Sequence, residues 1–157
     1  MRFITVDPKR EQMMVVDFPE LSDAMEIVGL RQGMIDHAVV YCNPLTGIGL
    51  GIVVYEFGLF ERDQHYFLIG DGRLYAGCAV LYAFDAKGNT IDMPDNLDKP
   101  NWLHSEEAAE RAIAAGKCMR PTSRLDNWQW PDDPPARVRE AMAQNRGKLY
   151  AGNSTRH

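Results

Sequence analysis

Short apolar runs separated by turn residues occupy the middle of the chain. These runs are rich in β-branched and aromatic side chains and cover residues 52–55, 66–69 and 78–84. Runs of this length, bounded by glycine and aspartate, are typical of β-strands. The turn after the last run places Gly88 where a hairpin needs a left-handed residue. We therefore predict a central sheet here, with residues 90–93 returning as the partner of the last strand.

The N-terminal third continues the strand pattern. Residues 2–7 alternate weakly, residues 13–18 are largely apolar, and a proline stops each stretch, which predicts a hairpin. Residues 35–42 form another predicted strand. Residues 46–51 alternate glycine with apolar side chains, a pattern that fits either a loop or a strand closely approached by another backbone.

Helix signals appear at three places, over residues 22–29, 105–116 and 136–145. Ser22 and Ser105 are good N-cap residues and are followed by acidic residues in the first helical turn. Gly29 and Gly116 are suited to ending the first two helices. The second helix is rich in alanine, which predicts close packing on the sheet.

The predicted fold class is α+β, with a mostly antiparallel sheet and two or three helices packed on one face. A chain of 157 residues fits one domain. We predict a single domain over residues 1–157, with a sheet-rich body over 1–93 and a helical and irregular C-terminal segment over 94–157. Residues 94–100 have the composition of a linker between the two parts.

Charge is distributed unevenly along the chain. Residues 1–116 carry 9 basic and 18 acidic residues, whereas residues 117–157 carry 8 basic and 4 acidic residues. An acidic body with a basic tail is suited to binding its own tail, to forming a homo-oligomer, or to presenting two faces to partners. A solvated surface with chance clustering of charge explains the same numbers.

Cysteine content and hydropathy favour a cytoplasmic location. Cys42, Cys78 and Cys118 lie far apart and form no C-x-x-C pair, so neither a disulfide framework nor a zinc knot is predicted. No apolar run approaches the roughly 18 residues of a membrane span. The N-terminus lacks the apolar core of a signal peptide.

Few residues form a recognisable catalytic or metal-binding pattern. The four histidines, His37, His65, His104 and His157, have no metal-ligand spacing, and we predict neither a metal site nor a cofactor. Cys118 lies between Lys117 and Arg120, which would lower the pKa of its thiol, although an incidental residue at a helix end is the plainer interpretation. An alternative site would bring four side chains to one sheet edge: Glu56, Asp63, His65 and Asp71.

Basic and aromatic residues alternate in the C-terminal segment. We predict that Trp128, Trp130, Arg137 and Arg139 form a binding surface, because tryptophan and arginine are common at binding hot spots. Alternatively, both tryptophans pin the irregular segment onto the sheet. The acidic balance of the whole chain argues against a nucleic-acid partner.

Several short motifs of the body form a recognisable series. A strand ends near Asp7-Pro8, a helix follows at 21–29, and the motifs at 55–58, 74–82 and 85–88 come after it. In this layout residues 1–93 resemble a family of small uncharacterised proteins encoded by phages and plasmids. The resemblance implies a mobile-element origin and no known activity.

These observations favour a non-enzymatic binding protein. The resemblance suggests a phage or mobile-element accessory factor that acts on a host protein, for example as an inhibitor of a defence system. The absence of a catalytic constellation, the small size and the polarised charge favour this class. The alternative is a small enzyme or ligand-binding domain that uses the site near His65.

Overall fold

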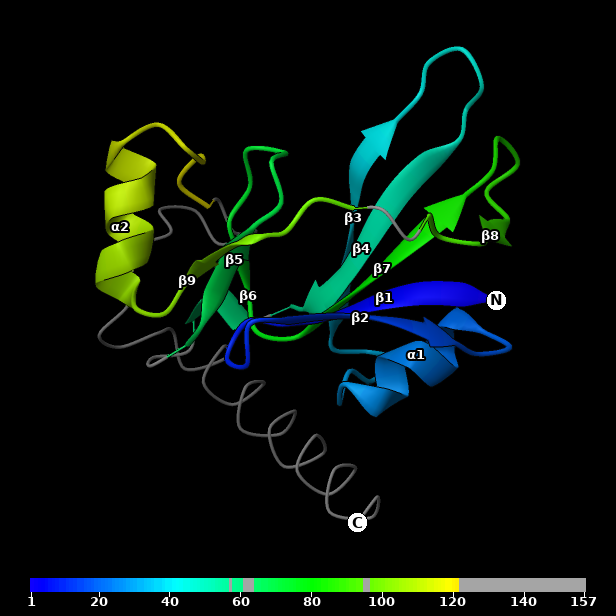
Figure 1. Ribbon diagram of the computed structural model, residues 1–157, viewed down its shortest axis with the longest axis horizontal. Coiled ribbons are helices and arrows are strands. Elements are labelled where there is room, and N and C mark those ends of the chain that lie inside the picture. The colour runs from blue at the N-terminus through cyan, green and yellow to red at the C-terminus, as the bar shows by residue number, and fades with distance from the viewer. Residues whose placement is uncertain (57, 61–63, 95–96, 122–157) are drawn as a thin grey trace.

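The computed structural model describes residues 1–56, 58–60, 64–94 and 97–121. In this part of the chain, six strands form a large antiparallel sheet with the order β2-β1-β7-β4-β3, and β8 pairs with β7 (Figure 1). The strands are β1 (Arg2–Asp7), β2 (Gln12–Asp17), β3 (Ile35–Cys42), β4 (Gly49–Tyr55), β7 (Ala79–Phe84) and β8 (Thr90–Ile91).

A small antiparallel sheet with the order β6-β5-β9 stands beside the large one. Its strands are β5 (Tyr66–Leu68), β6 (Tyr75–Ala76) and β9 (Asn101–Leu103). The described helices are α1 (Leu21–Ile27), α2 (Glu106–Ala114) and the short 3₁₀ helix η1 (Gly58–Phe60). The α+β fold class with a mostly antiparallel sheet is therefore confirmed.

The two sheets pack against each other. Phe67 and Tyr75 of the small sheet stack with ring centroids 5.4 Å apart. Both rings belong to the same core cluster as Ile4, Ile52 and Leu81 of the large sheet. Because side chains alternate along a strand, the neighbours of Phe67 and Tyr75 turn to the opposite face of the small sheet.

Each of the described α-helices, α1 and α2, covers the outer face of a different sheet. Ala24 and Met25 of α1 pack on the large sheet, on the face opposite to the small sheet. Ala109 and Ala112 of α2 pack on the outer face of the small sheet, in a cluster that includes Tyr66. We predicted one sheet with its helices on one face, whereas the described residues form two sheets with one α-helix on each. The small sheet has apolar residues on both faces, so both of its faces must be covered.

The helix ends follow the sequence signals with one exception. Ser105 caps α2 by accepting a hydrogen bond from the backbone N–H of Ala108 at 3.0 Å, as predicted. The predicted cap of α1 is wrong, because Glu20 and not Ser22 is the N-cap residue. Glu20 and Asp23 form a reciprocal capping box there. Gly29, with φ +81°, follows the end of α1 as expected.

The glycine-alternating segment becomes the start of β4. A Cβ atom on Gly51 would lie 2.3 Å from Cζ of Tyr82, and one on Gly49 would lie 2.4 Å from Cζ of Phe84. Glycine is required at both places because aromatic rings of β7 lie across this strand. The expectation of close approach is therefore met, by aromatic side chains of β7 at both glycines and also by the backbone carbonyl of Tyr41 at Gly49.

The predicted helix over residues 136–145 lies outside the described residues, and the single-domain prediction stays a prediction. Within the described ranges, no helix is both long and apolar enough to cross a membrane.

Candidate functional site

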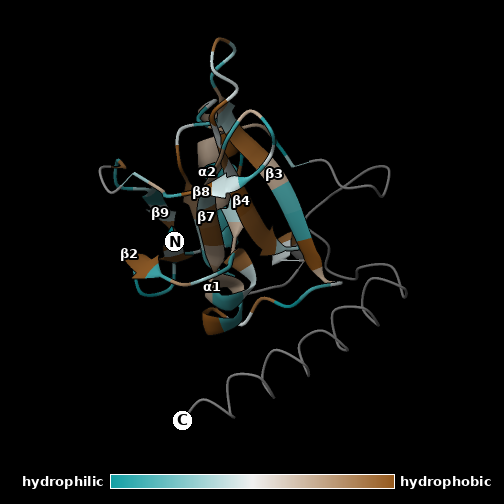
Figure 2. Cartoon of the chain, turned by 90° about the vertical axis from the view of Figure 1, so that its right-hand side faces the viewer, coloured by the Kyte–Doolittle hydropathy of each residue, from teal (hydrophilic) through white to brown (hydrophobic). Residues whose placement is uncertain are grey.

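The β3–β4 hairpin projects from the body (Figure 1). It carries exposed apolar side chains. The exposed fractions are 53% for Val39, 57% for Tyr41, 93% for Leu45 and 47% for Ile48. Residues 38–55 contain no charged side chain. Figure 2 shows hydrophobic residues along β3 and β4 toward the turn. We call Val39, Tyr41, Leu45 and Ile48 the hairpin surface.

Hydrogen bonds within the turn fix the tip of this hairpin. The backbone N–H of Asn43 donates to the carbonyl of Ile48 at 2.9 Å, and that of Gly47 donates to the carbonyl of Asn43 at 2.8 Å. The Asn43 side chain accepts a hydrogen bond from the N–H of Leu45 at 2.9 Å. Leu45 is therefore exposed on an ordered turn, and this order lowers the entropy cost of binding.

The outer edge of β3 is protected against pairing with another strand. The register with β4 shifts between Val39 and Tyr41, which indicates a β-bulge. In addition, the guanidinium of Arg73 donates to the carbonyl of Val39 at 3.3 Å. Bulges and occupied backbone groups prevent edge-to-edge association. The hairpin surface is therefore suited to contacts by side chains rather than by strand addition.

A second polar site lies at the end of the small sheet. His65 directly precedes β5 and His104 directly follows β9, and the register of the two strands places these residues opposite each other. Their Nδ1 atoms are 2.9 Å apart. Nε2 of His104 lies 2.7 Å from Oε1 of Glu11, on the β1–β2 turn. We call Glu11, His65 and His104 the histidine site.

The hydrogen-bond pattern fixes the proton positions that the histidine site allows. With neutral rings, Nε2–H of His104 donates to Glu11 and Nδ1 of His104 accepts from Nδ1–H of His65. In this tautomer Nε2 of His65 carries a lone pair that the hydrogen bonds between His65, His104 and Glu11 do not use. In the other neutral tautomer of His65, with its proton on Nε2, the site presents two Nδ1 lone pairs to a cation.

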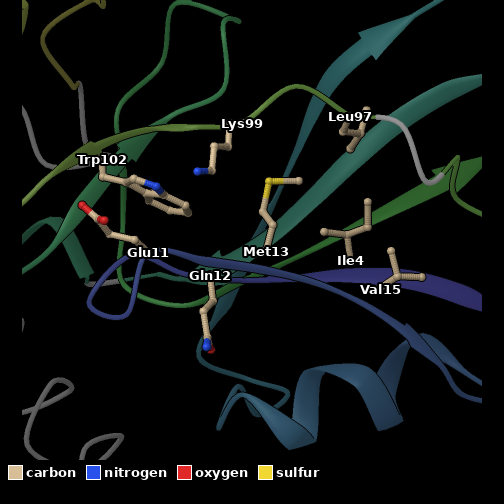
Figure 3. A pocket seen from close by; sticks show the side chains of 8 residues that line it. All are labelled: Ile4, Glu11, Gln12, Met13, Val15, Leu97, Lys99 and Trp102. Carbon is tan, nitrogen blue, oxygen red and sulfur yellow. The ribbon is translucent and has the colours of Figure 1, made fainter.

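A groove of about 340 Å³ adjoins the histidine site. Figure 3 shows Glu11 beside Trp102, while Lys99, Met13 and Leu97 surround the open space. The groove lies between β2 and the segment that enters β9. Apolar walls with one acid and one base at the rim make a small, open binding surface.

The described residues of the alternative enzyme site do not line one common cavity. Glu56 lines a cavity of about 440 Å³, and neither His65 nor Asp71 lines it. Asp71 accepts a hydrogen bond from the Tyr75 hydroxyl. Burial and this carboxylate raise the pKa of Tyr75 far above its usual value. Asp63 lies outside the described residues, and Tyr75, which lines the cavity together with Glu56, is the residue that contacts Asp71.

The cysteines are free, and the predicted activation of Cys118 is wrong. Cys118 is buried, and burial raises the pKa of its thiol instead of lowering it. Burial, together with the charge of Asp7, raises the pKa of Cys78 to about 12. Cys42 is exposed on β3. Arg120, one of the two expected activating residues, pairs instead with Glu110 at 2.6 Å.

The predicted binding residues of the tail, Trp128, Trp130, Arg137 and Arg139, lie outside the described residues. The histidine site was not predicted, because 39 residues separate its histidines and because no strand was predicted between the linker over residues 94–100 and the helix over 105–116. The only signal that could have helped to locate His104 is that it lies between a strand and the capped helix α2.

Comparisons with protein-family models, with curated proteins and with solved structures find no match. The resemblance of residues 1–93 to phage and plasmid proteins therefore stays a prediction.

Proposed function

We propose that the protein is a non-enzymatic binding protein that docks on another protein through the hairpin surface. The observation that carries this proposal is the exposed, uncharged tip of the β3–β4 hairpin, where Leu45 is 93% exposed. Exposed apolar residues that are grouped on one projection mark interaction sites more often than scattered ones do.

The ordered turn and the protected edge support the same proposal. Burying an apolar surface stabilises a complex by about 25 cal/mol for each Å² removed from water. A turn already held by hydrogen bonds loses little conformational freedom when it binds. The bulge and Arg73 prevent non-specific strand pairing at the same edge. Together these features favour a specific partner with a concave apolar surface.

The expected partner class comes from the sequence. The resemblance to mobile-element proteins makes a host protein the first candidate, with inhibition of a defence system as the proposed consequence. The predicted tail surface of Trp128, Trp130, Arg137 and Arg139 is a separate proposal for a second contact.

Co-purification with matched variants tests the docking surface. Leu45→Lys places a charge at the hairpin tip, whereas Ile27→Lys places the same charge at another exposed apolar residue, on α1. We expect Leu45→Lys to reduce recovery of the partner at least tenfold and Ile27→Lys to leave it unchanged. Equal recovery of the partner by both variants would overturn the proposal that the hairpin surface is the docking site. Replacing the four tail residues with alanine tests the tail in the same assay.

A further inference from the structure

We propose that the histidine site binds a late first-row divalent metal ion, with Cu²⁺ bound most tightly, through Nδ1 of His65 and Nδ1 of His104. The His65 ring carries its proton on Nε2 in the metal-bound form, so that both Nδ1 atoms are free to coordinate. This inference is independent of the docking function, because the histidine site and the hairpin surface use different residues.

The distance between the two nitrogens fits this assignment. At metal–nitrogen bond lengths of about 2.0–2.1 Å, two ligands at a right angle stand about 2.9 Å apart. The observed Nδ1–Nδ1 separation is 2.9 Å. A tetrahedral angle would require about 3.3 Å with the same bonds. A right angle is typical of the tetragonal geometry of Cu²⁺ and Ni²⁺. Relative to a linear hydrogen bond, each ring would turn by about 45° to aim its lone pair at the shared ion.

Glu11 supplies the outer contact that metal-binding histidines usually have. Its carboxylate lies 2.7 Å from Nε2 of His104, the nitrogen that faces away from His65. A hydrogen bond at this position keeps the proton on Nε2 and leaves Nδ1 free to coordinate. Glu11 has φ +52°, a conformation rare for residues other than glycine, and this conformation occurs where its side chain meets His104.

Regular structure holds both ligands in place. The backbone carbonyl of His65 accepts a hydrogen bond from Gly77 N–H at 2.9 Å, which continues the pairing of β5 with β6. His104 stands between the last residue of β9 and Ser105, the N-cap of α2. Facing positions on two paired strands bring side chains within reach of one ion.

The site is open and has a limited ligand set. The described residues contain no group of three or more histidine, cysteine or acidic side chains that could hold a metal ion. The side chain of His104 is 44% exposed, so water can fill the remaining coordination positions. We therefore expect an exchangeable site that prefers Cu²⁺ over Ni²⁺ and Zn²⁺ and does not bind Mg²⁺.

Titration of the full chain with each metal salt alone tests the site. We expect one Cu²⁺ per chain, with affinity reduced at least tenfold by His65→Ala or His104→Ala. Glu11→Gln should weaken binding about tenfold, because outer contacts typically contribute that much. The double variant His37→Ala/His157→Ala is the matched control and should bind as the native chain does. Affinity should fall with decreasing pH, because protons compete for Nδ1.

A spectroscopic measurement on the native chain tests the site without relying on variants that could fail to fold. Long-range ¹H–¹⁵N spectra of the native chain report which ring nitrogen coordinates the diamagnetic ion Zn²⁺. Shifts of Nδ1 in both His65 and His104 would support the site. Unchanged Cu²⁺ affinity in His65→Ala, coordination through Nε2, or binding confined to the control histidines would each overturn it.

Discussion

The hairpin surface and the histidine site are built in opposite ways. The hairpin surface comes from one continuous segment, and its exposed side chains are apolar and uncharged. The histidine site joins residues 11, 65 and 104, and its side chains are polar and share hydrogen bonds. A local apolar element is suited to a large partner, whereas a polar cluster of distant residues is suited to a small ligand.

The two regions also differ in what supports them. Rings of Tyr82 and Phe84 lie across the glycines at the start of β4, next to the turn of the hairpin. The end of the small sheet depends on the core between the sheets, on Phe67 in particular, and on the capped start of α2. Changes at these supports should therefore affect one region more than the other.

Phe67→Ala should have the largest effect. Phe67 is fully buried between the two sheets, and the loss of such a side chain costs about 3–5 kcal/mol of unfolding free energy. Chemical denaturation measures this loss. Val39→Ala, at an exposed position of the hairpin, should change stability by less than about 0.5 kcal/mol. Similar losses in both variants would contradict the described core.

Gly51→Ala should have the next largest effect and should act on the hairpin. The added Cβ meets the ring of Tyr82, and overpacking of this kind costs about 1–3 kcal/mol. Denaturation of Gly51→Ala in the native background and in Tyr82→Ala separates the contact from a general effect. The cost should fall when the ring is absent, and an equal cost in both backgrounds would refute the contact.

Ser105→Ala should destabilise the protein by about 1 kcal/mol, because the first turn of α2 loses its cap. Ser22→Ala is the matched control, since Glu20 and not Ser22 caps α1. Thermal or chemical unfolding of both variants gives the comparison. A larger loss for Ser22→Ala would show that the caps are assigned incorrectly.

Cysteine alkylation should produce the smallest perturbation and should distinguish the exposed hairpin from the buried body by reactivity. At pH 8, Cys42 on the hairpin should react before Cys78, because Cys42 is exposed and the raised pKa of Cys78 keeps its thiol protonated. Mass spectrometry of samples taken over time measures the order. The folded state retains the Cys78 proton up to a pKa of about 12, so this group lowers stability as pH rises above the pKa of the unfolded thiol. Faster labelling of Cys78 would contradict its burial.

The sequence patterns predicted the elements whose signals are local. The strand runs of β1, β3 and β7, the Gly88 turn and the Ser105 cap all follow from neighbouring residues, and the structure contains each of them. The cap of α1 was wrong because glutamate is a less common cap than serine. Here Glu20 works through its reciprocal contact with Asp23.

The division into two sheets and the histidine site depend on contacts between distant residues. The short strands β6 and β9 are too brief to show a period, and β9 follows proline-rich residues that resemble a linker. Without β9, nothing in the sequence places His104 opposite His65. The hairpin surface was missed for another reason, because the pattern of β3 does not show that this strand lies at a sheet edge.

Photo-cross-linking at position 45 tests the central proposal most directly. A photoreactive phenylalanine analogue replaces Leu45 in one chain and Ile27 in a control chain, and both are irradiated in the cells that express them. We predict an adduct with a different protein at position 45 and none at position 27. The absence of any adduct at position 45, or an adduct of twice the chain mass only, would contradict docking on another protein.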